Sequence, residues 1–528
     1  MRMASLSSLE RLTEALDEVK RHCPDLPVLA LHWMHVKHPI HPLQEELSRN
    51  DSALGKGPDF GIWGRGGVAL ARLCVGLLYA SLLTGRLLLV RLRLRDQIRA
   101  LKDRSFDLVA KTRCVAPDGL PLERDFYYGN LQKNLQDRGA SALMISGHPA
   151  GMSWQRLGKL KASASFPFQL PELALVPFSS PFRFVGQQAV ACVRLMRFAR
   201  RVKDPFVRRL ALRASTDCVF HWMIPIGLYY WIGQSAVKAW HPKAVVVLYE
   251  GYNWEQCLWR GVKAADPACR TVGYQHTILL RHNCALLKSQ GNGAASLRPD
   301  VVLCLGPRTE SMLKSSHSRS DLFPFGTFRQ MPAPSTCQEP RPQKQTVLVM
   351  PEGYPEEVKL LFHSAIQAAR RLPQVQFILR CHPLFPPGRI PLSLREEIAQ
   401  TPNIRFSTGV PIDKDFAESS VILYRGSSSV LYAIFHGLKP VYLHDDRYRE
   451  VDPLFELDSW RERARSPEEL EQILRRYSEE NPERSLNFWR KAREYVEAYM
   501  VPVSQASIDR FLDSIGLVGQ RATEMVLR

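Results

Sequence analysis

The fold of this chain is decided by the stretch Val421-Ile422-Leu423-Tyr424-Arg425-Gly426-Ser427-Ser428-Ser429. Its first four residues are hydrophobic and are followed by turn residues, which predicts a buried strand. The hydrophobic residues between Val430 and Phe435 recur at helical spacing, and the serines before them can cap a helix. Pro440–Leu443 predicts a second strand. Strand, turn, helix and strand in this order predict a parallel sheet with crossover helices.

The alternation continues upstream of this unit. A helix is predicted at Glu356–Arg371. Further hydrophobic runs predict strands at Thr346–Met350, Val375–Arg380 and Asn403–Ser407. This spacing predicts a doubly wound sheet, which we assign to a domain of residues 345–457. Downstream, residues 458–528 predict C-terminal helices, one of which opens at Ser466-Pro467.

A proline-rich segment divides the chain. Residues 329–345 show no periodicity, so we expect an interdomain linker at 336–344. We expect residues 26–335 to form another α/β domain with helical insertions, and residues 1–25 to form an N-terminal amphipathic helix. Strands of that first domain are predicted at Val28–His32, Leu108–Lys111, Ala142–Ser146, Val245–Glu250, Arg270–Tyr274 and Val301–Leu305. The expected fold class is α/β, with two Rossmann-like doubly wound domains and C-terminal helices.

Length and composition exclude several classes of protein. With about 150 residues per domain as a guide, a chain of 528 residues has room for more than one domain. Hydrophobic residues make up 45% and charged residues 23%, which excludes a wholly disordered or fibrous chain. The eleven cysteines include no Cys-x-x-Cys pair, so we expect neither a zinc ribbon nor a disulfide framework. A reducing, cytoplasmic location is expected for the same reason.

The formal net charge of +19 predicts an anionic partner. Residues 86–113 and 192–213 carry much of the positive charge. In the second stretch hydrophobic residues interleave with arginines, which is typical of an amphipathic helix on anionic lipid, although a solvated helix face has the same pattern. No nucleic-acid-binding signature is present, so nucleic acid is not an expected partner. We therefore expect a peripheral position on the inner face of the cytoplasmic membrane.

Two hydrophobic segments are long enough to be mistaken for membrane spans. Gly66–Val90 contains Arg72 and Arg86, each of which would cost about 2.5–3.5 kcal/mol at the centre of a bilayer, so we expect an interfacial or core helix there. Cys218–Val237 has no charged residue but is interrupted by Pro225 and glycines. We expect that segment to be a buried helix that leads into the next strand.

In open α/β sheets, ligands bind beyond the carboxyl ends of the strands, so polar residues that follow the predicted strands are the site candidates. Gly426 and Ser427–Ser429 form a turn whose N–H groups and hydroxyls suit a phosphate, with a plain serine cap as the alternative. His382-Pro383 follows the strand that ends at Arg380. A histidine at this place can donate a hydrogen bond to a leaving phosphate or protonate it.

The first domain offers carboxylates and a histidine at strand ends. Glu250 follows Val245–Tyr249, and Glu255 lies five residues later. Either carboxylate could deprotonate an acceptor hydroxyl, while Glu255 could instead be a first-turn acid of the following helix. His276 follows the next predicted strand. The shared placement of these residues, more than any single motif, indicates an active site.

With these residues in view, the arrangement resembles the bacterial surface-polysaccharide glycosyltransferases of the GT-B type that use CMP-activated sugars, the sialyl-, polysialyl- and Kdo-transferases. The resemblance is carried by Glu250-Gly251, His382-Pro383 and Ser427-Ser428-Ser429, in the family's order. The stretch Gly273–His276 is similar to a segment common in capsule and lipopolysaccharide biosynthesis proteins, and also resembles the CDP-glycerol polyol-phosphate transferases. The resemblance covers roughly residues 240–445.

The resemblance implies a GT-B fold with an interdomain cleft and a metal-independent transferase without a cofactor. Its donor would be a CMP-sugar such as CMP-Kdo or a CMP-activated sialic-acid-like sugar, and its acceptor a surface polysaccharide or lipid-linked glycan. The residues implied to bind the nucleotide sugar are Arg380, His382, Pro383, Arg425, Gly426, Ser427, Ser428 and Ser429. Glu250 would be the base, but Tyr249 stands where a further acid often precedes the Glu-Gly pair, which leaves Glu255 and His276 as alternatives.

Other functions remain compatible with the same frame. They are a polyol-phosphate transferase, a UDP-sugar epimerase or transferase, and a non-catalytic, membrane-associated scaffold of polysaccharide assembly. No Asp-x-Asp cluster is evident, and Asp445-Asp446 is expected to be a loop or sugar contact, so no metal site is expected.

Overall fold

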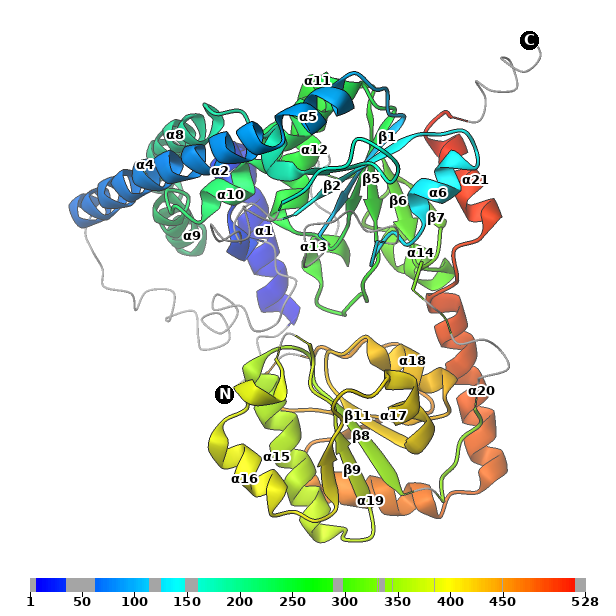
Figure 1. Cartoon of the computed structure of the whole chain (residues 1–528). Helices are drawn as coiled ribbons and strands as arrows, with labels where there is room; N and C mark the ends of the chain where they lie inside the picture. Colours follow the sequence, from blue (N-terminus) through cyan, green and yellow to red (C-terminus); the bar gives the residue numbers. More distant parts are fainter. Residues whose placement is uncertain are drawn as a thin grey trace.

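The structure is a computed structural model that describes residues 6–34, 62–113, 125–147, 160–287, 298–329, 331, 338–343, 345–383, 385–448 and 450–517. Two parallel sheets flanked by helices lie one above the other in Figure 1. The fold class is α/β with two Rossmann-like doubly wound domains, which is the GT-B arrangement that we expected.

The first sheet has seven described strands in the order β3-β2-β1-β4-β5-β6-β7. Every neighbouring pair is parallel. The chain moves outward from β1 to β3 and then returns to place β4 on the other side of β1, so the strand order reverses between β1 and β4. The strands are β1 (Leu108–Thr112), β2 (Ala142–Ser146), β3 (Gln169–Pro171), β4 (Ala244–Leu248), β5 (Arg270–Tyr274), β6 (Val301–Cys304) and β7 (Asp321–Pro324).

The second sheet repeats this topology with six described strands in the order β10-β9-β8-β11-β12-β13. Its neighbours are also parallel, and its order reverses between β8 and β11. The strands are β8 (Thr346–Met350), β9 (Gln376–Leu379), β10 (Ile404–Phe406), β11 (Val421–Tyr424), β12 (Lys439–Leu443) and β13 (Glu462–Ala464).

Continuous hydrophobic strands place both sheets inside the protein. All five residues of β4 and all four of β11 are buried, as parallel strands covered on both faces require. The helices of the first domain are α4 (Ile62–Arg93), α5 (Arg95–Lys102), α6 (Leu131–Gln136), η4 (Glu172–Leu175), α8 (Ser180–Arg201), α9 (Pro205–Asp217), α10 (Met223–Gly227), α11 (Tyr229–Trp240), α12 (Asn253–Ala265), α13 (Cys284–Leu287) and α14 (Pro307–Lys314). Those of the second are α15 (Pro355–Arg371), η7 (Pro387–Arg389), α16 (Leu392–Ala399), α17 (Ile412–Glu418) and α18 (Ser429–Phe435).

The prediction of a strand at Val28–His32 is wrong. After helix α1 (Leu6–His22), the chain forms a short helix α2 (Leu26–Leu29) and a 3-10 turn η1 (His32–Met34). Pro27 lies in the first turn of α2, where its missing N–H has no cost. All four residues of α2 are buried, and a short helix that is buried on every side has the same hydrophobic pattern as a buried strand.

The C-terminal helices join the two domains. Helix α19 (Pro467–Ser478) packs on α15, whereas α20 (Pro482–Tyr499) contacts α14 of the first domain and α18 of the second. After α20 the Val501 N–H donates to the Leu305 carbonyl, and α21 (Gln505–Ser514) packs Phe511 against Phe325 beside the first sheet. Of the expected linker 336–344, residues 338–343 are described and form neither helix nor strand, and the others lie outside the described residues.

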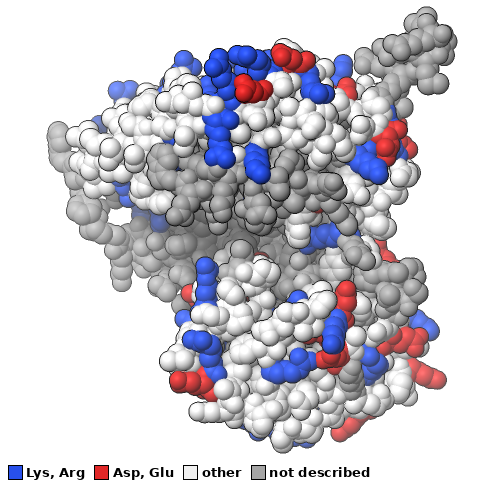
Figure 2. Space-filling model, viewed as in Figure 1, with Lys and Arg blue, Asp and Glu red and all other residues white. Residues whose placement is uncertain are grey.

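Helix α4 lies on the outer side of the first domain, where it packs against α8 (Figure 1). Among the described residues, one helix is long and apolar enough to cross a membrane, at Gly66–Arg93, and 28% of its most hydrophobic window is buried. In the same view most of the surface over α4 shows no charged residue, and Lys and Arg side chains gather where α4 ends and over α5 (Figure 2). The segment Cys218–Val237 forms the mostly buried α10 and most of α11, which leads into β4 as expected.

The close packing of α11 on α12 depends on glycine. A methyl group on Gly261 would overlap the carbonyl oxygen of Tyr230. We expect Gly261→Ala to lower the free energy of unfolding of the first domain by about 1–3 kcal/mol, the usual cost of overpacking, as measured by urea denaturation. Gly85 is a matched control because it lies in α4 with no atom within 4 Å of the added carbon. Gly85→Ala should raise stability by up to about 1 kcal/mol through helix propensity, and equal losses in both variants would contradict this packing.

Candidate active site

The candidate residues lie where the strand order of each sheet reverses. In the first sheet Arg113 follows β1 and Glu250 follows β4, and these two strands are neighbours. In the second sheet Glu352 follows β8, and Arg425-Gly426 follows the neighbouring β11. Such points open a crevice at the carboxyl edge of a doubly wound sheet, because the connections leave in opposite directions. Both domains therefore place charged side chains at their natural ligand-binding edge.

Glu250 is at the centre of a charged cluster in the first domain. Its Oε1 lies 3.4 Å from Arg113 Nη1 and 3.2 Å from His276 Nε2. The side chains of Glu250 and His276 are almost fully buried, whereas Arg113 is 29% exposed. Two of the sequence candidates are thus in contact, and Arg113 joins them although sequence reasoning had treated it only as part of a basic stretch.

Aromatic rings hold Arg113 in place. Its guanidinium carbon lies 4.8 Å from the centre of the Tyr252 ring and 5.3 Å from that of Trp254. Trp254 also lies 5.5 Å from the ammonium nitrogen of Lys111, which is buried and pairs with Glu172 at 3.0 Å. Cations near ring faces are stabilised by the ring quadrupole, more strongly when water is excluded. The rings therefore fix the guanidinium in position to pair with the Glu250 carboxylate.

The contact between Glu250 and His276 has the geometry of a hydrogen bond. A carboxylate oxygen and a ring nitrogen at 3.2 Å attract each other only if one of them carries a hydrogen. The other ring nitrogen, Nδ1, lies 3.4 Å from the Tyr274 carbonyl, and the Tyr127 ring packs almost at right angles to the imidazole, with the ring centres 4.8 Å apart. The Glu250 carboxylate has further lone pairs beyond this hydrogen bond, and these could accept a proton from a ligand at the sheet edge.

Glu255 has a different role, because its carboxylate caps the loop after β4. It accepts hydrogen bonds from the N–H groups of Glu250, Gly251 and Tyr252 at 2.9–3.3 Å, and its side chain is fully buried. This agrees with the alternative expected from sequence, in which Glu255 is a structural acid in the first turn of the following helix. Glu255 shapes the loop that carries Glu250, and we no longer consider it a candidate base.

The second domain holds the serine turn in a similar way. Glu357 accepts hydrogen bonds from the N–H groups of Gly426 and Glu352, both at 3.2 Å. A methyl group on Gly426 would overlap the Glu352 carboxylate, so a larger residue here would require the Glu352 side chain to move. Burial raises the pKa of Glu357, while the Gly426 N–H and Arg425 oppose the rise. The Gly426 N–H is therefore used within the protein and is not open to a phosphate.

The three serines remain the groups available to a ligand at this edge. Their hydroxyls make no hydrogen bond to any described residue, and Ser427 is mostly buried. Ser428 precedes α18 as its N-cap, but its side chain does not cap the helix. The serine-cap interpretation is thus not what the structure shows, and the hydroxyls stay candidates for anion binding.

The two arginines predicted near the donor are held by protein groups. Arg380 pairs with Asp415 and donates to the Val410 carbonyl at 2.9 Å. Arg425 is buried, donates to the Leu443 carbonyl at 3.0 Å and lies 5.6 Å from the Tyr442 ring. Both side chains organise the loops beneath the site, and their predicted direct contact with a nucleotide stays a prediction.

His382 is half-buried at the carboxyl end of β9, and the Phe385 N–H donates to its carbonyl. Pro383 beside it is exposed. Burial lowers the pKa of His382 below its ordinary value, so the imidazole is neutral at physiological pH. A neutral imidazole can donate one N–H to a phosphate oxygen. A neutral imidazole is a poor general acid. Of the two roles expected for His382, the lowered pKa therefore favours hydrogen bonding to the phosphate over its protonation.

The carboxyl edges of the two sheets are tied to each other. Arg281, in the loop after β5, donates to the Phe455 carbonyl at 3.1 Å and lies 3.6 Å from Glu450, both in the loop after β12. Close to Glu250, burial raises the pKa of Tyr252 to about 12, and the Tyr354 phenol of the second domain adds to the rise. The loops that carry the two candidate clusters are thus neighbours across the domain boundary.

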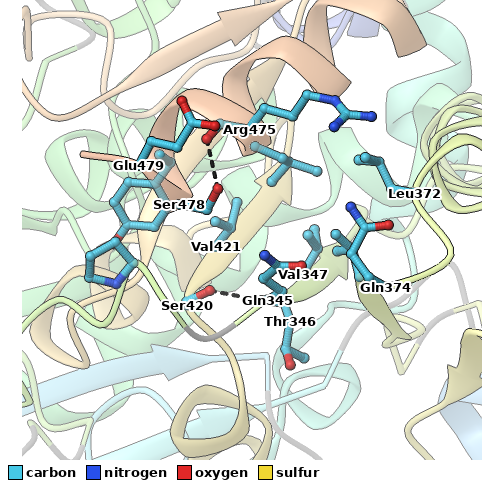
Figure 3. Close-up of a pocket in the computed structure, with 14 residues that line it drawn as sticks. Gln345, Thr346, Val347, Leu372, Gln374, Ser420, Val421, Arg475, Ser478 and Glu479 are labelled. Atoms are coloured by element: carbon cyan, nitrogen blue, oxygen red, sulfur yellow. Dashed lines mark hydrogen bonds between the residues drawn. The ribbon is translucent and has the colours of Figure 1, made fainter.

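A cavity of about 220 Å³ lies at the opposite edge of the second sheet. It is lined by Thr346 and Val421, the first residues of β8 and β11, and by Arg475 and Ser478 of α19 (Figure 3). Among its lining residues, Ser420 donates to the Thr346 carbonyl and Ser478 to that of Arg475. Because it lies at the amino ends of the strands, the cavity is remote from His382 and the serines.

No group of three or more His, Cys, Asp or Glu side chains that could hold a metal ion is found among the described residues. Asp445 instead pairs with Arg447 at 2.7 Å.

Comparison with known proteins gives likeness of fold alone. No family model matches the chain, and no curated protein matches its sequence. A trehalose 6-phosphate synthase from Burkholderia multivorans is 10% identical with a TM-score of 0.44, covering 80% of this chain and 98% of that one. A UDP-GlcNAc 2-epimerase from Neisseria meningitidis is 9% identical with a TM-score of 0.41, covering 77% and 98%. The glycosyltransferase of kitacinnamycin is 11% identical with a TM-score of 0.42, covering 78% and 100%. At these values the likeness carries no argument about function.

The capping role of Glu255 is testable by stability. Glu255→Ala leaves buried N–H groups without an acceptor, so we expect it to lower the free energy of unfolding by about 1–3 kcal/mol, measured by urea denaturation. Glu494→Ala is the control, since this carboxylate is exposed on α20 and should change stability by less than about 0.5 kcal/mol. A loss of stability in the control alone, or in neither variant, would show that Glu255 does not hold the loop.

The lowered pKa of His382 predicts a pH dependence. The unfolded chain takes up this proton near the ordinary pKa of about 6.5, and the folded protein takes it up at lower pH, so acidification favours unfolding. We expect the stability lost between about pH 7.5 and 5.5 to be smaller in His382→Gln, and the imidazole resonance of His382 to titrate below about 6.5. A midpoint above that value would contradict the neutral imidazole inferred here.

Proposed function

We propose that this protein is a glycosyltransferase that moves a sugar from a nucleotide-sugar donor to a glycan acceptor. The observation that carries the proposal is the pairing of Glu250 with Arg113 and His276 at the reversal point of the first sheet. Neighbouring loops of the second domain bring the serine turn and His382 to the facing carboxyl edge. One domain thus offers a base and the other offers hydrogen-bond donors for a phosphate, the two requirements of transfer from a nucleotide sugar.

In this proposal the second domain binds the donor. The hydroxyls and N–H groups of Ser427–Ser429, with a neutral N–H of His382, would hold the phosphate that links nucleotide and sugar. These donors would bind the phosphate more strongly as it gains charge on leaving, and interactions that strengthen in this way lower the barrier. Arg425 and Arg380 would support the loops from beneath and add positive potential without direct contact.

The first domain would supply the base. Glu250 would take the proton of an acceptor hydroxyl while that oxygen bonds to the anomeric carbon. The bond from that carbon to the phosphate oxygen would break, leaving its electron pair on the nucleotide. Arg113 would favour the ionised form of Glu250 until the acceptor is bound, and His276 would orient the carboxylate through their hydrogen bond. A direct displacement of this kind inverts the anomeric centre.

We further propose that the donor is a CMP-sugar such as CMP-Kdo or a sialic-acid-like sugar, and that the acceptor is a surface polysaccharide or lipid-linked glycan. The motif order Glu250-Gly251, His382-Pro383 and Ser427–Ser429 supports this choice. We also propose a location on the cytoplasmic face of the membrane, which the net charge of +19 supports. The competing assignments are a polyol-phosphate transferase, a UDP-sugar epimerase or transferase, and a scaffold without activity.

A thermal-shift panel of CMP, CDP, UDP, GDP and ADP tests the donor. A ligand at about 100 times its dissociation constant stabilises the folded state by about 2.7 kcal/mol, which is a measurable rise in melting temperature. We expect a rise with CMP that is lost in His382→Ala. A rise with UDP or CDP alone would contradict the CMP proposal, and silence across the panel would favour the scaffold.

The role of Glu250 is tested separately from donor binding. Glu250→Gln keeps the shape of the side chain but removes its basicity, so we expect a fall in kcat of about 100-fold or more, the range for loss of a positioned base, with the CMP thermal shift unchanged. Glu497→Gln, an exposed carboxylate in α20, is the control and should leave kcat unchanged. Full activity in Glu250→Gln would remove Glu250 from the mechanism.

A further inference from the structure

Helix α4 has a protein-facing side and an unusually apolar outer side. Its buried residues recur every three or four positions and pack toward α8; they are Ala69, Gly76, Ala80, Leu83, Leu87 and Val90. The outer side exposes eight large hydrophobic side chains by 43–65% of their surface; they are Leu70, Val75, Leu77, Leu78, Leu82, Leu88, Leu89 and Leu92. At about 1.5 Å per residue, this face is about 33 Å long. Scattered exposed leucines are ordinary, but a continuous face of this size marks an interaction surface.

The arginines of this segment do not interrupt the apolar face. Arg72 Nη1 donates to the Thr216 carbonyl and lies 3.3 Å from Asp217 in α9, while its guanidinium lies over the Phe220 ring. Arg86 is half-buried, and Arg91 donates to the Val176 carbonyl at 3.0 Å. Within the described stretch 66–92, no exposed side chain is charged. The cost that argued against a membrane span from sequence does not apply to lipid contact on the outer side, because Arg72 and Arg91 are directed toward protein groups.

Positive charge lies next to this face. Arg93, the last residue of α4, is exposed, and the exposed Arg95, Arg99 and Lys102 follow in α5. Lys and Arg side chains gather over this part of the surface (Figure 2). Helix α8, which packs on α4, exposes the hydrophobic Phe182, Val190 and Val193 along one side, and the same side continues as the exposed Arg197, Arg200 and Arg201. Apolar residues that can enter the acyl region, next to cations that can meet anionic headgroups, are the pattern of interfacial membrane helices.

We propose that the outer side of α4, together with the exposed side of α8, docks this protein on an anionic lipid bilayer with α4 lying in the plane of the interface. The helix does not need to cross the bilayer, since its inner side is buried against the domain from Ala69 to Val90. Lipid fits the surface better than a second copy of the chain because the bordering charges are predominantly of one sign, and two such surfaces would repel each other on contact.

The inference deepens the membrane location proposed above, on which it rests, and does not depend on the transfer reaction. It names the surface that makes contact and the lipid class that it needs. Docking by the first domain would also hold the proposed acceptor side at the membrane, where a lipid-linked glycan lies.

The test measures binding of the full-length protein to vesicles of phosphatidylcholine alone and of phosphatidylcholine with about 30% phosphatidylglycerol, by co-sedimentation. We expect binding to the anionic vesicles that weakens as salt is raised, because headgroup contacts are screened. Leu78→Glu should weaken binding about tenfold. Changing Leu78, Leu82 and Leu89, which share one face of α4, to glutamate together should weaken binding at least about 100-fold.

Matched variants separate lipid contact from loss of fold. Leu392 in the second domain is 62% exposed against 65% for Leu78, so Leu392→Glu makes the same change elsewhere and should bind as the unaltered protein does. Leu78→Phe keeps the apolar surface and should also retain binding. Melting temperatures and the nucleotide thermal shift of each variant report on folding and on the donor site.

Three results would overturn the inference. They are no binding to anionic vesicles, equal loss of binding in Leu78→Glu and Leu392→Glu, and a dimer in light scattering that the triple variant separates, which would identify a second copy as the occupant. If vesicle binding fails while CMP still stabilises the protein, the docking surface is wrong and the transferase proposal stands. If vesicle binding holds while no nucleotide stabilises the protein, the docking surface stands and the transferase proposal is wrong.

Discussion

The parallel pairing of β1 with β4 is the contact on which the candidate site depends. It aligns Leu108 with Ala244, so Arg113 and Glu250 leave neighbouring strands at the same edge. The pairing of β4 with β5 then brings His276 beside Glu250. The second sheet repeats this arrangement with β8 and β11. A shift of one residue in either pairing would move these side chains apart. The register of the buried hydrophobic strands therefore determines which charged side chains meet at the edge of each sheet.

A buried carboxylate needs hydrogen-bond donors to replace the water that it loses, and both domains provide backbone N–H groups for this purpose. Glu255 and Glu357 each accept N–H groups from the loop that precedes or faces them, which offsets the loss of water and fixes the loop. Glu250 and Glu352 then stand on rigid loops. The site thus combines carboxylates that accept backbone N–H groups with Glu250, which pairs with the side chains of Arg113 and His276, and hydrogen-bond geometry distinguishes the two kinds.

Sequence patterns predicted the central strands and the edge strand β10, but they missed the other three edge strands of the two described sheets. β5, β8 and β11 have the bounds expected from their hydrophobic runs, whereas β3, β7 and β13 are short edge strands with polar or proline residues and no such run. Strand ends could be identified as the site, but the contact of Glu250 with Arg113 spans 137 residues and depends on strand order. For the same reason, the inward direction of Arg72, which is paired with Asp217, could not be predicted.

The measurement that tests this account most directly is a crystal structure of the protein with bound CMP. The account predicts the nucleotide at the carboxyl edge of the second sheet, with its phosphate within hydrogen-bond distance of Ser427–Ser429 and His382 and on the side that faces Glu250. Nucleotide bound in the cavity lined by Thr346 and Arg475, at the amino ends of the strands, would contradict it. In that case the charged cluster around Glu250 would need another explanation.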